Sequence, residues 1–225
     1  SGLGLALYDL HKLLGIKPEK LSIKNKLAVA FGARGRGKAL AHFEPGSFVI
    51  NLTRYSRPEK ENTRSENFKR VNLILNDGGV GAFAHEYGHA LDYYGGLHIE
   101  RGDHFTLSRD DSTDPKPDTT LLKKSTLKGL MEKLLYKIIW STPTKHTPYY
   151  ARLTKGKTRK YFKQRNEIFA RAFEVYVQYK LEKEKHKNIF LNRSKYPTRY
   201  YMTTKEMKRV IGEFDTLINA LKKHL

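Results

Sequence analysis

One short motif constrains this chain more than any other feature: His85-Glu86-x-x-His89, which lies within residues 81–94. Residues four positions apart lie one above the other on an α-helix, so both imidazoles can reach the same ion. Asp77 is a candidate N-cap before this segment, and Gly95-Gly96 is a plausible stop after it. The pattern therefore predicts one helix of about fifteen residues.

The same spacing is the metal-binding signature of zinc peptidases, in which the glutamate acts as the general base. Glu86 follows the first histidine, from where it can take the proton of a water molecule held at the metal. The alternative is that His85 and His89 are ordinary buried histidines of an amphipathic helix. Gly88 lies between the two histidines and permits the close approach of a neighbouring element.

A catalytic zinc site usually has three protein ligands and one water molecule, so a third ligand is required. His98, His104 and His146 are candidates, but none lies at a short fixed spacing within an ordered element. We expect Glu167, which opens a later helical pattern. The alternative for Glu167 is a glutamate that only interacts with the helix dipole.

Two further carboxylates are candidates for holding a ligand imidazole in place. Glu174 lies seven residues after Glu167, hence on nearly the same helix face, and Arg171 lies between them. A carboxylate behind a metal ligand can accept the proton of its imidazole. Asp92, three residues after His89, is the other candidate, with a surface aspartate as the alternative.

The formal net charge is +20, from 43 Lys and Arg against 23 acidic residues. Such a balance favours polyanionic partners, although a lysine-rich solvated surface gives the same count. Residues 141–165 are basic and carry Tyr149, Tyr150 and Tyr161, which could stack on bases or line a substrate cleft. Nucleic acid is therefore a candidate partner.

The chain has no cysteine, so any zinc must be held by histidine and carboxylates. A cysteine-free composition is typical of a reducing compartment, and we expect a cytoplasmic protein. No apolar run of about 18 residues is present, so we expect no membrane span. The first residues also lack the basic start of a secretory signal.

Hydrophobic periodicity predicts an α+β fold. A helix is expected at residues 6–14, and strands at 27–31, 39–43 and 47–52, with Glu44-Pro45-Gly46 as a turn. The Gly/Arg-rich segment 32–38 reads as a strand connection, and the polar segment 53–70 as a loop or insertion.

The second half of the chain is expected to be mostly helical. Apolar residues at a period of 3.6 predict helices at 127–138 and 166–177, and a last helix from a capping box of Thr203 and Glu206. The acidic segment 99–120 is expected to be a solvated loop, since it lacks the ligand spacing of a calcium site. Residues 141–165 are expected to be irregular.

The sequence resembles known metallopeptidases at these motifs. His85-Glu-Tyr-Gly-His-Ala-Leu-Asp92 is similar to the zinc helix of lethal factor-type gluzincins, and Glu167-Ile-Phe-Ala-Arg-Ala-Phe173 to their glutamate helix. The resemblance implies a zincin-like fold with Glu167 as the third ligand. It also implies that Tyr161 stabilises the tetrahedral intermediate, although Tyr161 lies one residue nearer to the glutamate than the tyrosine of that family.

A resemblance to the first type of large polyvalent protein-associated domain covers more of the chain, roughly residues 25–180. It rests on Phe31 to Pro45, Val49 to Arg54, the zinc helix and Phe169 to Glu174. Such domains occur in phages, plasmids and conjugative elements, so the resemblance implies an intracellular protein of a mobile element. The polar segment 53–70 is longer here than in that family.

We therefore expect one zincin-like domain over residues 1–225, with an N-terminal helical region (1–24), a catalytic core (25–180) and a C-terminal helical appendage (181–225). A small mixed or antiparallel sheet would accompany the histidine helix. The expected function is zinc-dependent hydrolysis of peptide bonds in an intracellular protein, with Glu86 and Tyr161 as catalytic residues. The alternative is a nucleic-acid-binding module whose metal site is structural or vestigial.

Overall fold

The computed structural model describes residues 2–32, 41–52, 81–193 and 196–225. Its larger sheet has the strand order β1-β3-β2, built from β1 (Ala28–Phe31), β2 (Ala41–Glu44) and β3 (Val49–Leu52). β1 pairs with β3 in parallel, and β2 pairs with β3 antiparallel, with Ala41 opposite Leu52. The expectation of a small mixed sheet within an α+β fold is confirmed.

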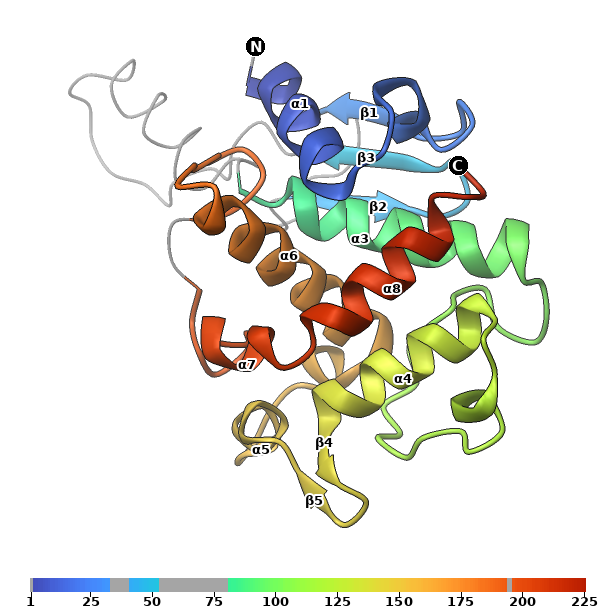
Figure 1. The fold of residues 1–225 in the computed structure, drawn as a ribbon, viewed down its shortest axis with the longest axis vertical. Coiled ribbons are helices and arrows are strands. Elements are labelled where there is room, and N and C mark those ends of the chain that lie inside the picture. The colour runs from blue at the N-terminus through green and yellow to red at the C-terminus, as the bar shows by residue number, and fades with distance from the viewer. Residues whose placement is uncertain (1, 33–40, 53–80, 194–195) are drawn as a thin grey trace.

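Two helices form the centre of the molecule and run next to each other below the sheet (Figure 1). They are α3 (Phe83–Tyr94) and α6 (Arg165–Lys183), and most of their residues are buried. They meet at Gly88, where a Cβ atom would lie only 3.1 Å from Cδ1 of Phe173. Carbon atoms normally pack about 3.5–4.0 Å apart, so the missing side chain sets the close approach of the helices.

The remaining helices surround this pair. α1 (Gly2–Leu14) and the 3₁₀ turn η1 (Pro18–Ser22) precede the sheet. The C-terminal half holds η3 (Leu121–Lys123), α4 (Leu127–Ile139), α5 (Pro148–Thr154), η4 (Lys160–Lys163), α7 (Thr204–Lys208) and α8 (Ile211–Leu221). The predicted helical C-terminal half is therefore confirmed.

The last predicted helix begins as expected but is divided in two. Thr203 and Glu206 form the predicted capping box at the start of α7. A break at Arg209 and Val210 separates α7 from α8. The apolar residues of both helices and of the break between them still belong to the hydrophobic core. The buried ones are Met207, Val210, Phe214, Leu217, Ile218 and Leu221.

The α-helix α3 ends at Tyr94, directly before Gly95-Gly96 as predicted. The chain does not leave the helical path there, because it continues into the π-helical turn η2 (Gly95–Ile99). A Cβ at Gly95 would lie 2.4 Å from Cδ1 of Leu107, and one at Gly96 would lie 2.4 Å from the carbonyl oxygen of Phe105. The two glycines therefore make room for segment 105–107.

The segment 99–120 is irregular, as expected, but it is not simply solvated. Thr106, Leu107 and Ser108 are buried. Asp110 binds the Thr106 amide at 2.8 Å, and Asp118 binds the Thr120 amide at 2.8 Å. These carboxylates therefore fix the turns of the loop.

Residues 141–165 were also predicted to be irregular, and this was wrong. They contain part of the hairpin of β4 (Trp140–Thr142) and β5 (Lys145–His146), then α5 and η4. Thr147 is the N-cap of α5, because its hydroxyl accepts a hydrogen bond from the Tyr150 amide. Pro148 is the first residue of the helix.

Three sequence expectations fall outside the described residues: the Asp77 cap, most of the Gly/Arg segment 32–38 and the polar segment 53–70. Among the helices that the structure describes, none is both long and apolar enough to cross a bilayer.

Candidate metal centre

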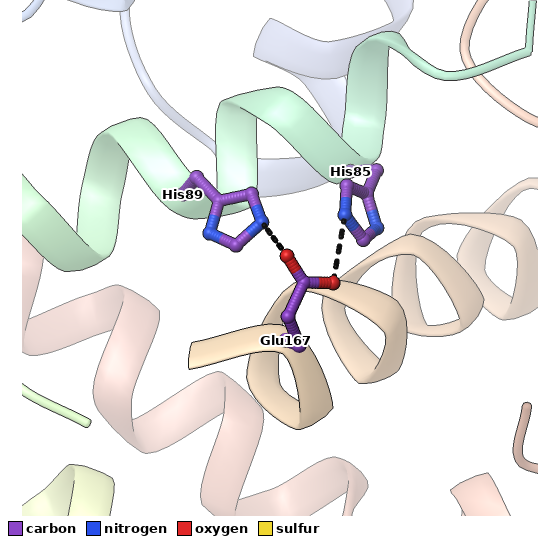
Figure 2. Close-up of side chains that lie close together, drawn as sticks. All are labelled: His85, His89 and Glu167. Atoms are coloured by element: carbon purple, nitrogen blue, oxygen red, sulfur yellow. Dashed lines mark ion pairs between the residues drawn. The ribbon is translucent and has the colours of Figure 1, made fainter. Parts of the chain in front are cut away.

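The helix α3 carries His85 and His89 on one face, towards the first turn of α6 (Figure 2). Their ring centroids are 4.9 Å apart, and the ring planes are inclined by 78°. The four-residue spacing produces this arrangement, because one helical turn separates the two side chains.

Glu167 approaches both imidazoles from the first turn of α6 (Figure 2). Its Oε1 lies 3.2 Å from Nε2 of His89, and its Oε2 lies 3.6 Å from Nε2 of His85. The three residues each offer one ligand atom, and these atoms all lie within 4.8 Å of one another. Two imidazoles and one carboxylate thus converge from two helices.

This donor set fits zinc chemically and by its spacing. Zinc bonds to nitrogen and oxygen are about 2.0–2.1 Å long, so neighbouring ligand atoms of a tetrahedral site are about 3.4 Å apart. The His–Glu distances of 3.2 Å and 3.6 Å bracket that value. A set of two histidines and one glutamate also leaves a fourth position open for water, as catalytic sites require.

The other candidate histidines lie elsewhere and have other neighbours. His98 packs against Phe48 and Tyr94, His104 pairs with Asp110, and His146 packs against Trp140 and Tyr150.

The charges around His85 favour a cation. Burial opposes a charged imidazole, but the nearby carboxylates of Glu167 and Glu174 raise the pKa of His85 to about 10. Burial likewise opposes ionisation of Glu167, yet the nearby imidazoles of His85 and His89 hold its pKa well below the usual range. In the absence of metal, a proton on His85 thus supplies positive charge among these carboxylates.

Glu174 lies behind His85, on the side away from Glu167. Its Oε2 is 3.4 Å from Nδ1 of His85, and its side chain is 1% exposed. Within the described part of the chain, neither of these two atoms has a hydrogen-bond partner of good geometry. A small rotation of the imidazole would allow Nδ1–H to donate to Glu174, leaving Nε2 for a metal.

Arg171 holds the other side of Glu167. Its Nη1 lies 3.2 Å from Oε2 of Glu167, and its Nη2 donates to the carbonyl oxygen of Phe162. The guanidinium is buried, with 3% of its side chain exposed. It therefore orients Glu167 and links η4 to α6.

Asp92 is not a surface residue, which was the alternative considered for it. It is fully buried, and it accepts hydrogen bonds from the amide and hydroxyl of Ser108, at 3.0 Å and 2.5 Å. Burial raises the pKa of Asp92 to about 6, while the charge of His89 acts in the opposite direction. Its hydrogen bonds anchor the loop at 106–108 to α3, and support of His89 stays a prediction.

A cavity of about 380 Å³ opens beside two of the donors, His85 and Glu167, and Glu86 and Tyr161 both line it. Glu86 is 6% exposed, and Tyr161 is 50% exposed. Burial of the phenol and the charge of Glu167 raise the pKa of Tyr161, so its hydroxyl is protonated at neutral pH. The structure thus brings both residues to the donor cluster, and their catalytic roles stay predictions.

The other two tyrosines of segment 141–165 do not reach this cavity. Tyr149 is 1% exposed and Tyr150 is 3% exposed. They belong to the core around α5, which leaves little of either ring free to stack on bases. Tyr149 lines a separate cavity together with Arg152 and Glu206.

The C-terminal region contributes cavity residues that sequence analysis missed. Arg193, Pro197, Tyr200 and Tyr201 line this cavity together with the residues of α3 and α6. Tyr200 stacks on Phe162 with ring centroids 4.2 Å apart. The basic and aromatic run at 193–201 was a usable signal, but no residue pattern connects it to the histidine helix in sequence.

Comparison with protein families agrees with part of the sequence resemblance. The family model of the large polyvalent protein-associated domain 1 matches residues 153–225. The match includes Tyr161, Glu167 and Glu174, and it extends over the region expected to be an appendage (181–225). It does not include His85 and His89. Comparisons with curated proteins and with solved structures gave no match.

Proposed function

We propose that this chain is a zinc-dependent peptidase of zincin-like type that hydrolyses peptide bonds of a protein substrate. One observation carries the proposal: the ligand atoms of His85, His89 and Glu167 lie within 4.8 Å of one another, beside a cavity lined by Glu86. The resemblance to domains of phages and plasmids supports an intracellular substrate.

His85, His89 and Glu167 would hold the zinc ion, with Glu174 fixing the His85 ring and Arg171 fixing the Glu167 carboxylate. A zinc ion bound there would supply Lewis acidity, which lowers the pKa of water and polarises a carbonyl group.

Glu86 is the general base of the proposed mechanism. Its position next to His85 in sequence brings its carboxylate to the same cavity, where little water competes for it. Glu86 takes a proton from the attacking water and then passes it to the leaving amine.

Tyr161 has the second role. Its protonated hydroxyl can donate a hydrogen bond to the oxygen of the carbonyl group under attack, where negative charge develops. Such a donor stabilises the transition state more than the substrate, so it accelerates the chemical step.

The strand β2 supports the choice of an extended peptide as substrate. Ala41 at its start lines the cavity, and β2 packs against α3. Within the described residues, β2 has a strand neighbour on one side only, namely β3. An extended peptide can add to a sheet edge through main-chain hydrogen bonds.

The test compares zinc content and proteolysis in matched variants. Wild type should hold about one zinc ion per chain by plasma mass spectrometry and should cut a peptide library, read by mass spectrometry. Glu86→Gln should keep the zinc and lose about 10²–10⁴-fold in cleavage rate. His85→Ala/His89→Ala should lose both. Cleavage by Glu86→Gln at the wild-type rate would exclude this mechanism.

The competing function is nucleic-acid binding with a structural metal, and the net charge of +20 favours it. Binding of a DNA or RNA oligonucleotide would then weaken steeply as salt rises, because counterions are released. No binding at low salt would exclude this alternative.

A further inference from the structure

Two long segments in the second half of the chain contain no acidic residue. Residues 133–166 have ten Lys and Arg and no Asp or Glu, and residues 185–205 have six Lys and Arg and no Asp or Glu. In the first half, residues 20–43 have the same character, with six Lys and Arg. Segments of like charge repel each other, so a fold that brings two of them into contact needs a physical reason for doing so.

The fold does bring these two segments together. Arg152 donates from Nε to the carbonyl oxygen of Thr198 at 3.0 Å, and Arg199 donates from Nη2 to the carbonyl oxygen of Lys155 at 3.3 Å. The stacked rings of Phe162 and Tyr200 make a third link. Figure 1 shows α5, which belongs to the first segment, next to α7, which begins at the end of the second segment.

A hollow of about 690 Å³ lies where they meet, lined by Arg152, Lys155, Gly156, Lys157, Thr198 and Arg199. Gly156 has φ of +68°, a conformation that glycine adopts easily, and this turn exposes the lysines on either side of it. Within the described structure, Lys155 and Lys157 form no ion pair, whereas Arg152 is held by Glu206.

The hollow and the candidate active-site cavity border the same short segment. Thr198 and Arg199 line the hollow, while Pro197, Tyr200 and Tyr201 line the cavity. A substrate chain that passes over this segment would meet both.

We propose that this hollow binds acidic side chains of the substrate, a few residues away from the bond that is cut. The inference rests on the proposed peptidase function, and it adds a substrate class, namely peptides with an acidic segment beside the cleavage site. Lys155 and Lys157 attract the carboxylates, and Arg199 contributes charge to the wall of the hollow.

The surroundings favour a peptide over a nucleic acid. Single-stranded nucleic acids bind where aromatic rings offer free faces along a basic groove. Here Tyr149 and Tyr150 are buried, and Phe162 and Tyr200 stack on each other. The hollow thus offers charge without a stacking platform.

The first test measures binding without cleavage. A fluorescent peptide with six glutamates and its all-glutamine counterpart are titrated onto zinc-loaded Glu86→Gln protein at physiological salt. Lys155→Glu/Lys157→Glu in that background should weaken glutamate-peptide binding at least 10-fold. Lys123→Glu/Lys124→Glu has the same change in charge, also on exposed lysines but at η3, and should weaken binding less than 2-fold.

Three outcomes would overturn the proposal: equal weakening by both double variants, no preference for glutamate over glutamine, or tighter binding of a DNA oligonucleotide of equal charge that depends on Lys155 and Lys157. The last outcome would assign the hollow to nucleic acid.

The second test separates this proposal from the peptidase function. Cleavage sites in a peptide library should show acidic residues near the cut bond, and this enrichment should fall in Lys155→Glu/Lys157→Glu. Cleavage without such enrichment would overturn the docking surface and leave the peptidase standing. If wild type binds the glutamate peptide through these lysines but cleaves nothing, the docking surface stands and the peptidase function is overturned.

Discussion

Two buried charge clusters share the first turn of α6. Arg165 pairs with Glu132 on α4, while Glu167, two residues later, pairs with His85 and His89 on α3. Both clusters join helices that are distant in sequence. They differ in how completely their polar atoms are used and in what they border.

The Arg165–Glu132 pair is well satisfied and enclosed. The two side chains are each 1% exposed, with Nη2 and Oε2 2.7 Å apart. Arg165 also donates to the carbonyl oxygen of Ser108 at 2.9 Å, and Glu132 accepts from the Asp118 amide at 3.0 Å. Burial lowers the pKa of Arg165 to about 10, so the guanidinium stays charged at neutral pH.

The Glu167 cluster is less completely satisfied and adjoins a cavity. Among the described residues, the buried atoms Nδ1 of His85, Oε2 of Glu174 and Nε of Arg171 have no hydrogen-bond partner. Unused buried polar atoms are costly, and they concentrate where a protein binds something. The comparison separates a pair that holds the fold from a cluster suited to hold an ion.

The largest expected effect is a loss of stability when the enclosed Arg165–Glu132 pair is broken. Glu132→Leu leaves Arg165 buried without its carboxylate, so we expect a loss of about 3–5 kcal/mol in the free energy of unfolding. Urea unfolding of the metal-free protein measures this loss.

The double variant Glu132→Leu/Arg165→Met should recover most of that stability, because the buried charge of Arg165 is removed with its partner. Arg109, which also lies 3.5 Å from Glu132, is left without this carboxylate but is 18% exposed. If the single and double variants are equally unstable, packing and not charge pairing determines stability there.

The next effect is on metal binding. Glu167→Gln removes an anionic ligand, and we expect zinc affinity to fall by more than about 100-fold, or ~2.7 kcal/mol. Competition with a chelating dye measures the affinity. Glu182→Gln, an exposed position on the same helix, is the control and should leave affinity unchanged.

A smaller effect is expected at Glu174, which would touch zinc only through His85. Glu174→Gln should weaken zinc binding about 10-fold, since partners of ligand imidazoles contribute about 10–100-fold. The same dye competition applies. Affinity equal to that of Glu182→Gln would show that Glu174 serves only as a wall of the cavity.

The smallest expected loss of stability is at a partly exposed ion pair, which serves as a reference for the two buried clusters. Arg152 binds Glu206 through two hydrogen bonds, at 2.8 Å and 2.7 Å. Burial opposes ionisation, but the bonds from Arg152 and Thr203 lower the pKa of Glu206. The pair therefore stabilises the fold above about pH 4.5, and this is lost as pH falls through the lowered pKa.

For Glu206→Gln we expect a loss of up to about 1 kcal/mol at pH 7, because solvent screens the pair. The difference from wild type should shrink as the pH falls below about 4. A difference that is constant between pH 7 and pH 3 would contradict the role of charge.

The site was predictable where its geometry is local. Helical periodicity alone places His85 with His89, and Glu167 with Glu174, on common faces. Sequence periodicity also gave the three strands of the larger sheet and most of the helices.

The rest depends on tertiary contacts that have no local pattern. The sequence gives no sign that Arg165 meets Glu132, or that Ser108 binds Asp92. Gly95-Gly96 ends α3 as its composition predicts, but nothing in the sequence shows that its glycines also make room for segment 105–107. Arg193 and Tyr201 reach the cavity only because the chain returns to it after α6.

Gly88 has a consequence for anyone who would transplant this donor set to another scaffold. It lies three residues after His85, and its missing Cβ allows Phe173 to pack directly against the α3 backbone. With any larger residue in place of Gly88, Phe173 would have to move by a few tenths of an ångström or more, and the spacing of α3 and α6 that brings the three side chains together would change. A transplanted site must therefore also include Gly88, which binds no ligand but sets the distance between the α3 and α6 backbones.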